Sequence, residues 1–233
     1  TKGEHKIALA DEKMLPDVAL LNTVFLNGLP AKVVADTGMD VLTHSIEAYV
    51  STNANPFSSS FAMKSIKLIF ENLVAHYNDR KIQGPKENVQ FASCLAGIAF
   101  DNSSLGINHS IAHTVGAKFH IAHGRANAII MPYVIEVNTE ANRKYFEISR
   151  ELGLPSDTIE EGKYSLLSFV RILKEKLAVE KSLKDYGVDF EAFKREIPSM
   201  LEDIKKDICT QYNPNKLTDE EYVRLLLKIY FGE

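Results

Sequence analysis

Histidines are concentrated in one short stretch of this 233-residue chain, and this stretch limits most strongly what the chain can fold into. Residues 106–127 read GINHSIAHTVGAKFHIAHGRAN and hold four of the seven histidines, which are His109, His113, His120 and His123. His109 and His113 are four residues apart, so on a helix both side chains lie on one face. We expect Gly116 to end this helix and Gly124 to mark a second turn.

A second pair at the same spacing lies upstream, where Asp40 and His44 stand in TGMDVLTHSIEAY. Oxygen and nitrogen donors without a thiolate suit a divalent transition metal. The candidate ligands are Asp40, His44, His109 and His123. One carboxylate and three neutral imidazoles would leave a divalent ion a net positive charge and open coordination positions, so that it could lower the pKa of an alcohol or polarise a carbonyl.

The other polar residues of these two segments have less certain roles. His113 follows His109 by one helical turn and is a candidate proton relay, because the ordinary pKa of imidazole lies near the operating pH. By spacing alone, His109 and His113 can exchange roles. His120 is the weakest candidate and is interpreted as a packed residue or one that supports the ligands. Glu47 is a candidate for a further carboxylate near the site, but we expect it to be an exposed helix residue.

The remaining patterns predict a mainly α-helical chain with a different beginning. Two apolar runs, residues 5–10 and 18–25, predict two short strands or an extended connector, and we interpret residues 1–29 as the remnant of an α/β domain. Residues 30–233 are interpreted as one helical domain. Its first helices are predicted at 39–50, 58–78 and 87–102, with a turn at Asp36–Gly38 before the first. Thr218 is the predicted cap of the last helix.

Composition restricts the partners and the compartment. The chain has 27 Lys plus Arg against 31 Asp plus Glu and no basic cluster, which argues against a nucleic-acid partner. No apolar run approaches the roughly 18 residues of a membrane span. Cys94 and Cys209 are far apart and form no CxxC, which fits a reducing, cytoplasmic location. GxSxG, HExxH and GxG are absent, so the sequence has no nucleophile elbow, zincin motif or dinucleotide loop.

Three segments of the chain resemble the iron-containing (group III) alcohol dehydrogenase family. They are ADTGMDVLTHSIEAYVS at 35–51, LAGIAFDNSSLGINHSIAHTVGAKFHIAHGRANAIIMPYVIEVN at 95–138, and CTQYNP at 209–214. The form FHIAHGRANA is similar to that of the bacterial butanol dehydrogenases and of the alcohol dehydrogenase part of bifunctional aldehyde–alcohol dehydrogenases. The resemblance covers nearly the whole chain and is densest in its first 140 residues.

The resemblance implies a role for each candidate. The four candidate ligands match the metal ligands of the family, which hold Fe2+ or sometimes Zn2+. His113 matches a histidine near the nicotinamide and the substrate, so the resemblance assigns the relay to His113 and a ligand role to His109. Lys6 falls where the family has a lysine near the cofactor ribose. The partners implied are a small alcohol or aldehyde and, in a homo-oligomer, further copies of the chain.

The family has two domains, an N-terminal α/β domain that binds NAD or NADP through a GGGS loop and a C-terminal helical domain of the dehydroquinate synthase-like type. This chain contains no GGGS and begins with Thr1. We therefore expect a fragment that lacks most of the cofactor domain, from an NAD(P)-dependent alcohol dehydrogenase or aldehyde reductase. Two other hypotheses fit the ligand pattern alone: a hydrolase that uses metal-bound water, and a non-catalytic helical module stabilised by metal.

Overall fold

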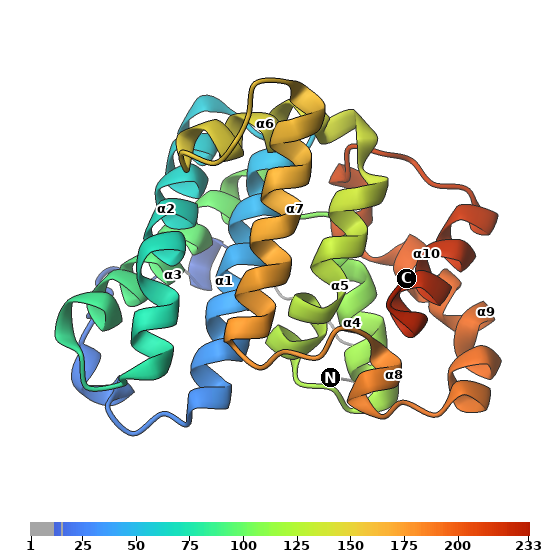
Figure 1. Cartoon of the computed structure of the whole chain (residues 1–233), viewed down its shortest axis with the longest axis horizontal. Helices are drawn as coiled ribbons and strands as arrows, with labels where there is room; N and C mark the ends of the chain where they lie inside the picture. The colour runs from blue at the N-terminus through green and yellow to red at the C-terminus, as the bar shows by residue number, and fades with distance from the viewer. Residues whose placement is uncertain (1–11, 15) are drawn as a thin grey trace.

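The computed structural model describes residues 12–14 and 16–233, and every regular element in these residues is a helix. The first three long helices, α1 (Ala31–Val50), α2 (Pro56–Asn78) and α3 (Gln83–Ser103), pack against one another. Helices α4 (Ile107–Phe119) and α5 (His123–Val137) lie on the other side of α1, so α1 is in the middle of the molecule (Figure 1). The prediction of a mainly helical chain is confirmed.

The second half of the chain covers this arrangement from two sides. Helices α6 (Asn142–Glu151) and α7 (Ile159–Lys176) pack together, and α7 also contacts α5. The short α8 (Leu183–Tyr186) leads to α9 (Phe190–Lys206) and α10 (Asp219–Phe231), which lie beside α4 and α5 (Figure 1). Four 3-10 helices complete the described elements: η1 (Glu12–Met14), η2 (Thr23–Leu26), η3 (Thr139–Ala141) and η4 (Ile208–Tyr212).

Two helices begin with side-chain caps: α2 begins two residues before its predicted start at residue 58, and α10 begins after the predicted cap. Asn55 caps α2 by accepting hydrogen bonds from the N–H groups of Phe57 and Ser58, and Pro56 occupies the first helical position. Thr218 caps α10 in a reciprocal arrangement with Glu221, as predicted. The caps satisfy N–H groups that have no partner within the helix.

The helix boundaries that we predicted from glycine positions are not those of the structure. The predicted turn before Gly38 is wrong, because α1 runs without a break from Ala31, and a Cβ on Gly38 would lie 2.2 Å from Leu73 Cδ1. This glycine permits a close approach of α1 and α2, which offsets its cost of about 1 kcal/mol inside a helix. Gly116 does not end α4, and Gly124 lies in the first turn of α5.

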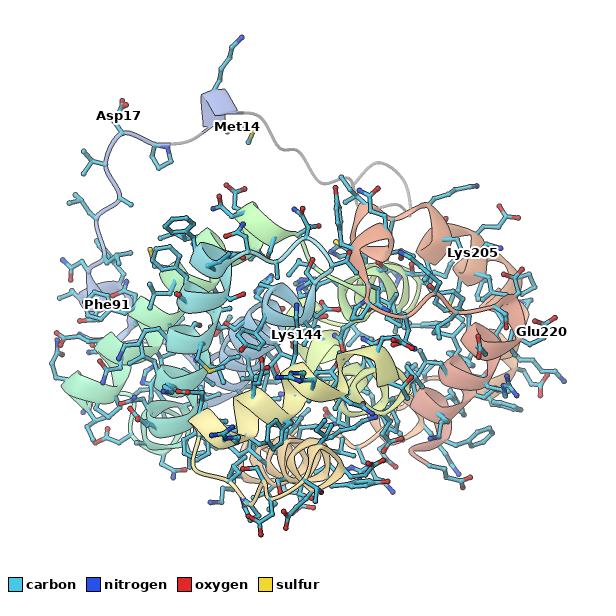
Figure 2. The ribbon with its side chains drawn as sticks, turned by 90° about the horizontal axis from the view of Figure 1, so that it is seen from above. Met14, Asp17, Phe91, Lys144, Lys205 and Glu220 are labelled. Carbon is cyan, nitrogen blue, oxygen red and sulfur yellow. The ribbon has the colours of Figure 1, made fainter. Side chains whose placement is uncertain are left out.

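The predicted strand at residues 18–25 is also wrong. The described residues contain no strand, residues 18–22 have no regular structure, and η2 occupies the end of the run. A strand needs a neighbour for its backbone groups, but Leu20 and Phe25 are more than four-fifths exposed. The predicted strand at 5–10 lies outside the described residues, and the boundary at residue 29 stays a prediction. Figure 2 shows Met14 and Asp17 on a segment that extends away from the helices.

The core lies between the helices around α1. Met39, Leu42 and Ile46 of α1 are almost completely buried against apolar residues of α2, α4 and α5. Helix α1 also carries buried polar residues, among them Asp36 and Glu47. Burying such groups costs free energy unless each has a partner. The functional site is therefore expected on the side of α1 that carries these polar residues. None of the helices in the described part of the chain is both long and apolar enough to cross a bilayer.

Candidate metal centre

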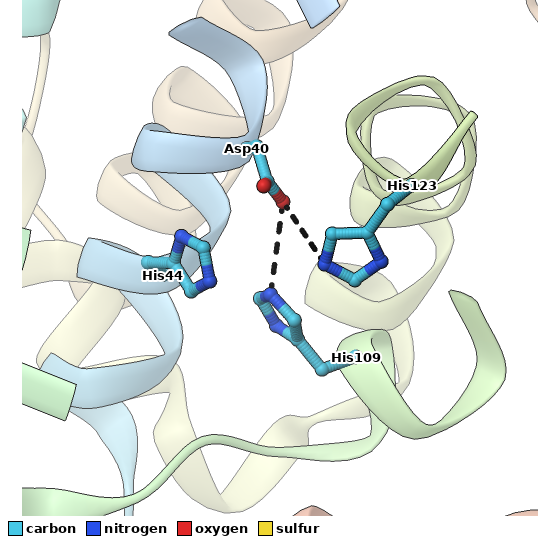
Figure 3. A group of neighbouring side chains, drawn as sticks. All are labelled: Asp40, His44, His109 and His123. Carbon is cyan, nitrogen blue, oxygen red and sulfur yellow. Dashed lines mark ion pairs between the residues drawn. The ribbon is translucent and has the colours of Figure 1, made fainter. Parts of the chain in front are cut away.

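The four candidate ligands meet at the junction of three helices. Asp40 and His44 are one turn apart on α1, His109 is in the first turn of α4, and His123 is the first residue of α5. One ligand atom from each lies within 4.8 Å of the ligand atoms of the other three. In Figure 3 the four side chains point toward one another. The structure therefore brings together the four residues whose spacing predicts a metal site.

Their separations leave room between them for an ion. Asp40 Oδ1 lies 3.7 Å from His109 Nε2 and 3.6 Å from His123 Nε2. Both distances are too long for direct hydrogen bonds. The rings of His44 and His109 stack with their centroids 4.4 Å apart, and Phe100 covers the His44 ring at 4.7 Å.

His109 provides the test of whether a metal fits. Its side chain is only 1% exposed, and its Nε2 atom has no hydrogen-bond partner among the described residues. Its other ring nitrogen, Nδ1, is hydrogen-bonded to the Glu47 carboxylate. A carboxylate on one imidazole nitrogen fixes the tautomer and directs the lone pair of the other nitrogen to a metal. The buried atom without a partner therefore fits a divalent ion among these four residues.

Glu47 was predicted to be exposed, and this prediction is wrong. Glu47 is 4% exposed and accepts hydrogen bonds from the backbone N–H groups of Asn108, at 2.8 Å, and His109, at 3.3 Å. These groups belong to the first turn of α4 and have no partner within that helix. A Cβ on Gly106 would lie 2.7 Å from Glu47 Oε1, so this glycine leaves space for the carboxylate. The spacing of Glu47 from Asp40 and His44, seven and three residues, was the signal for a shared face.

Asn127 is a site residue that the sequence reasoning missed. It is fully buried, and its Nδ2 donates to Asp40 Oδ1 at 2.7 Å and lies 3.1 Å from His123 Nε2. Asn108 Nδ2 in turn donates to Asn127 Oδ1 at 2.8 Å. Asn127 thus holds the Asp40 carboxylate in place. The available signal was its position four residues after His123, on the same helix face.

The ends of α1 and α5 are held together next to the ligands. A Cβ on Gly124 would lie 2.2 Å from the backbone oxygen of Asp36 and 3.3 Å from Asp40 Cβ. Arg125, which is 2% exposed, forms ion pairs with Asp36 at 2.6 Å and Glu180 at 3.0 Å. The close contact at Gly124 therefore sets the separation between the backbones that carry Asp40 and His123.

The electrostatics of the centre favour a cation. Burial, together with the neighbouring His109, lowers the pKa of His44 to about 3, so this imidazole is neutral with a lone pair to donate. Burial alone would lower the pKa of His109, but the carboxylates of Asp40 and Glu47 outweigh it and raise that pKa to about 9. Burial would likewise raise the pKa of Asp40, but the surrounding imidazoles hold it below its usual range. A proton on Nε2 of His109 and a metal ion bound to Nε2 would occupy the same position.

His113 lies beside this group and outside it. Its ring stacks on that of His123 with centroids 5.2 Å apart, and it meets the ring of His109 edge-on at 6.0 Å. Its Nδ1 lies 2.7 Å from Asp207 Oδ2, a partner that the sequence reasoning did not identify. His113, Asp207 and Cys209 form a second group of polar side chains next to the four ligands.

Two other candidates stand apart from the centre. His120 is exposed at the C-terminal end of α4, in the left-handed conformation with φ 53°, so its interpretation as a packed or supporting residue is wrong. Lys6 lies outside the described residues, and its expected place near a cofactor ribose stays a prediction.

Comparison with known proteins agrees with this geometry. Residues 34–230 match the Fe-containing alcohol dehydrogenase family, C-terminal. The chain is 41% identical to the NADPH-dependent butanol dehydrogenase of Clostridium saccharobutylicum, over 99% of this chain and 59% of that protein. It is 36% identical to the bifunctional aldehyde-alcohol dehydrogenase AdhE of Escherichia coli K12, over 98% of this chain and 28% of that protein.

A solved structure shows the same arrangement of helices. The iron-containing alcohol dehydrogenase from Thermococcus thioreducens is 34% identical and superimposes with a TM-score of 0.88, over 97% of this chain and 57% of that one. The chain thus spans less than two thirds of the length of these three proteins. The resemblance seen in the three sequence segments is confirmed over most of the chain. By sequence and by fold, the chain belongs to the Fe-containing alcohol dehydrogenase family, whose C-terminal domain it contains at residues 34–230.

Proposed function

We propose that this chain is the metal-binding, catalytic part of an NAD(P)-dependent alcohol dehydrogenase or aldehyde reductase that acts on a primary alcohol or aldehyde. The observation that carries the proposal is the buried Nε2 of His109, which lies among Asp40, His44 and His123 and has no hydrogen-bond partner in the described part of the chain. The names of the relatives support the chemistry, since they are described as a butanol dehydrogenase and an aldehyde-alcohol dehydrogenase. A cytoplasmic location is part of the proposal.

In this proposal Asp40, His44, His109 and His123 hold Fe2+ or Zn2+, both of which accept one carboxylate and three imidazoles. The ion would act as a Lewis acid toward the oxygen of the alcohol or aldehyde. Glu47 fixes the His109 ring, and Asn127 fixes the Asp40 carboxylate, so two of the four ligands are held before an ion binds.

Oxidation of a primary alcohol to an aldehyde removes one hydride and one proton. A bound NAD(P) would supply the acceptor for the hydride. We assign transfer of the proton to His113, because its ring stacks on that of His123 and His113 does not belong to the ligand group. Lys6 is proposed to lie near the cofactor ribose. Most of the cofactor site would come from an N-terminal α/β domain in a longer protein, and residues 1–29 would be its remnant here.

Metal content per chain, measured by elemental analysis after anaerobic purification, tests the proposal. We expect about one iron or zinc per chain, and its loss in His109→Ala. The matched control is His120→Asn, which removes an exposed imidazole from the same stretch, and asparagine tolerates the left-handed conformation found there. A full equivalent of metal in His109→Ala would overturn the ligand assignment. No metal in the unaltered protein would remove the basis of the proposed function.

A further inference from the structure

Asp207 connects the end of α9 to the site. It follows the last residue of α9 and caps η4, where its Oδ1 accepts a hydrogen bond from the N–H of Cys209 at 2.9 Å. Its other carboxylate oxygen, Oδ2, lies 2.7 Å from Nδ1 of His113. The two oxygens therefore have different partners, one from the Asp207 turn itself and one from α4.

The surroundings of Asp207 hold its carboxylate in this orientation. Ser110 Oγ lies 3.3 Å from Oδ1, on the same side as the Cys209 N–H. Thr210 Oγ1 lies 2.8 Å from Ser110 Oγ and donates to the carbonyl of Ile204 at 2.6 Å. With Oδ1 turned toward Cys209 and Ser110, Oδ2 is left to face the imidazole of His113.

This contact determines which nitrogen of His113 carries the proton. Burial would raise the pKa of Asp207, but the hydrogen bonds from His113 and from the Cys209 N–H outweigh it and lower that pKa to about 2. An ionised carboxylate only accepts hydrogen bonds, so the nitrogen facing it must be the donor. In the neutral ring the lone pair is then on Nε2, at the opposite edge of the imidazole. Stacking on His123 holds the plane of this ring.

We propose that Asp207 is the positioning residue for proton transfer, because it holds His113 in the Nδ1–H tautomer and leaves Nε2 as the one basic atom of that ring. The role of His113 in proton transfer rests on the proposed function. The structural part of the inference, the tautomer, depends only on the contact between Asp207 and His113. A carboxylate that orients a histidine has this effect in other enzymes, where an amide in its place imposes the wrong tautomer.

The tautomer can be read from the protein labelled with 15N-histidine, by two-bond 1H–15N spectra recorded with zinc bound and with zinc removed. A nitrogen with a lone pair resonates well downfield of a protonated one, and His113→Gln identifies the signals of this residue. We expect Nδ1 protonated and Nε2 bare in the unaltered protein. A bare Nδ1 there would overturn the inference without any variant.

Asp207→Asn should reverse the tautomer. The amide oxygen would keep the hydrogen bond from Cys209, so the NH2 group would face Nδ1 of His113 and leave the ring proton on Nε2. Asp207→Ala should release the ring to a mixture of both forms. The control Glu202→Gln removes one exposed charge from α9 and should change nothing. A ring that stays in the Nδ1–H form in a folded Asp207→Asn protein would refute the role of Asp207.

Activity separates this inference from the proposed function. In the metal-loaded enzyme that contains this chain, Asp207→Asn should reduce kcat for alcohol oxidation by about 10²–10⁴, the usual contribution of a general acid–base group. KM and metal content should change little, because Asp207 is not among the four ligands. A reversed tautomer with unchanged kcat would show that His113 moves no rate-limiting proton and would overturn the inference. Loss of metal in His120→Asn as well as in His109→Ala would instead count against the metal site.

Discussion

A single methyl group on Gly124 should separate the two helices that carry Asp40 and His123. The Cβ of an alanine at this position would lie 2.2 Å from the backbone oxygen of Asp36, which is about 1.2 Å short of the 3.4 Å at which ordinary contact begins. The obstructing atom belongs to the backbone of α1, so it cannot rotate away. The first turn of α5 or this part of α1 must move.

The cost of Gly124→Ala follows from this overlap. Overpacking of this kind destabilises by about 1–3 kcal/mol, and the better helix propensity of alanine offsets at most about 1 kcal/mol of it. We expect a net loss of roughly 1–2 kcal/mol in the free energy of unfolding. For a chain of this size that lowers Tm by about 2–4 °C per kcal/mol. A shift of about 1 Å also exceeds the tolerance of metal–ligand distances, so zinc affinity should fall by tenfold or more.

Urea unfolding in the presence of a chelator measures the first effect, and zinc titration against a chelating dye measures the second. The matched control is Gly97→Ala, because Gly97 lies inside α3 and a Cβ there would have nothing within 4 Å. This control should be stabilised by about 0.5–1 kcal/mol and bind zinc unchanged. If Gly124→Ala is as stable as Gly97→Ala, the close contact between α1 and α5 is not what sets the separation of the ligands.

Two further substitutions test a contact of the site and a strained backbone position. Glu47→Gln keeps the shape of the side chain but removes the charge facing His109 Nδ1, so zinc affinity should fall by about 10–100-fold while the helices remain folded. Unchanged affinity in a zinc titration, with Glu202→Gln as the control, would contradict the role of Glu47. Ser104→Gly should raise the free energy of unfolding, measured by urea denaturation, by about 1 kcal/mol. The reason is that Ser104 has φ 62° and ψ −172°, a region that essentially only glycine occupies without strain. A loss of stability would show that the hydroxyl group contributes more than the backbone strain costs.

Local spacing pointed to a metal site, but it left open whether His109 or His113 is the third histidine ligand, and only the family resemblance chose His109. Asp40 and His44 are four residues apart, as are His109 and His113, and a helix places each pair on one face whatever the surrounding fold. Spacing did not distinguish His109 from His113. The structure does so through partners distant in sequence, since Glu47 faces His109 and Asp207 faces His113. Spacing places Glu47 on the same face as Asp40 and His44, but the pairing of each carboxylate with its histidine depends on how α1, α4 and the end of α9 pack together.

The failures of prediction have the same cause. Gly38 and Gly116 suggested turns because glycine is unfavourable inside an isolated helix, yet packing decided both positions. The apolar run at residues 18–25 suggested a strand, but a strand depends on a neighbouring strand that the described residues do not supply. Glu47 appeared exposed because a carboxylate usually is. It is buried because the first N–H groups of α4 needed an acceptor.

The partners of the polar residues on α1 support the proposal that the centre binds an ion. Each carboxylate on this side, buried at Asp36 and Glu47 and half-buried at Asp40, has a partner: Asp36 has Arg125, Asp40 has Asn127, and Glu47 has the first turn of α4. After these pairings the buried Nε2 of His109 still has no hydrogen-bond partner among the residues that the structure describes. A lone pair buried in this way costs free energy that a proton, a hydrogen-bond donor or a cation at that point can recover. A metal ion would occupy this position while making contact with Asp40, His44 and His123 as well, so the arrangement that stabilises the helices is also the one that prepares the site.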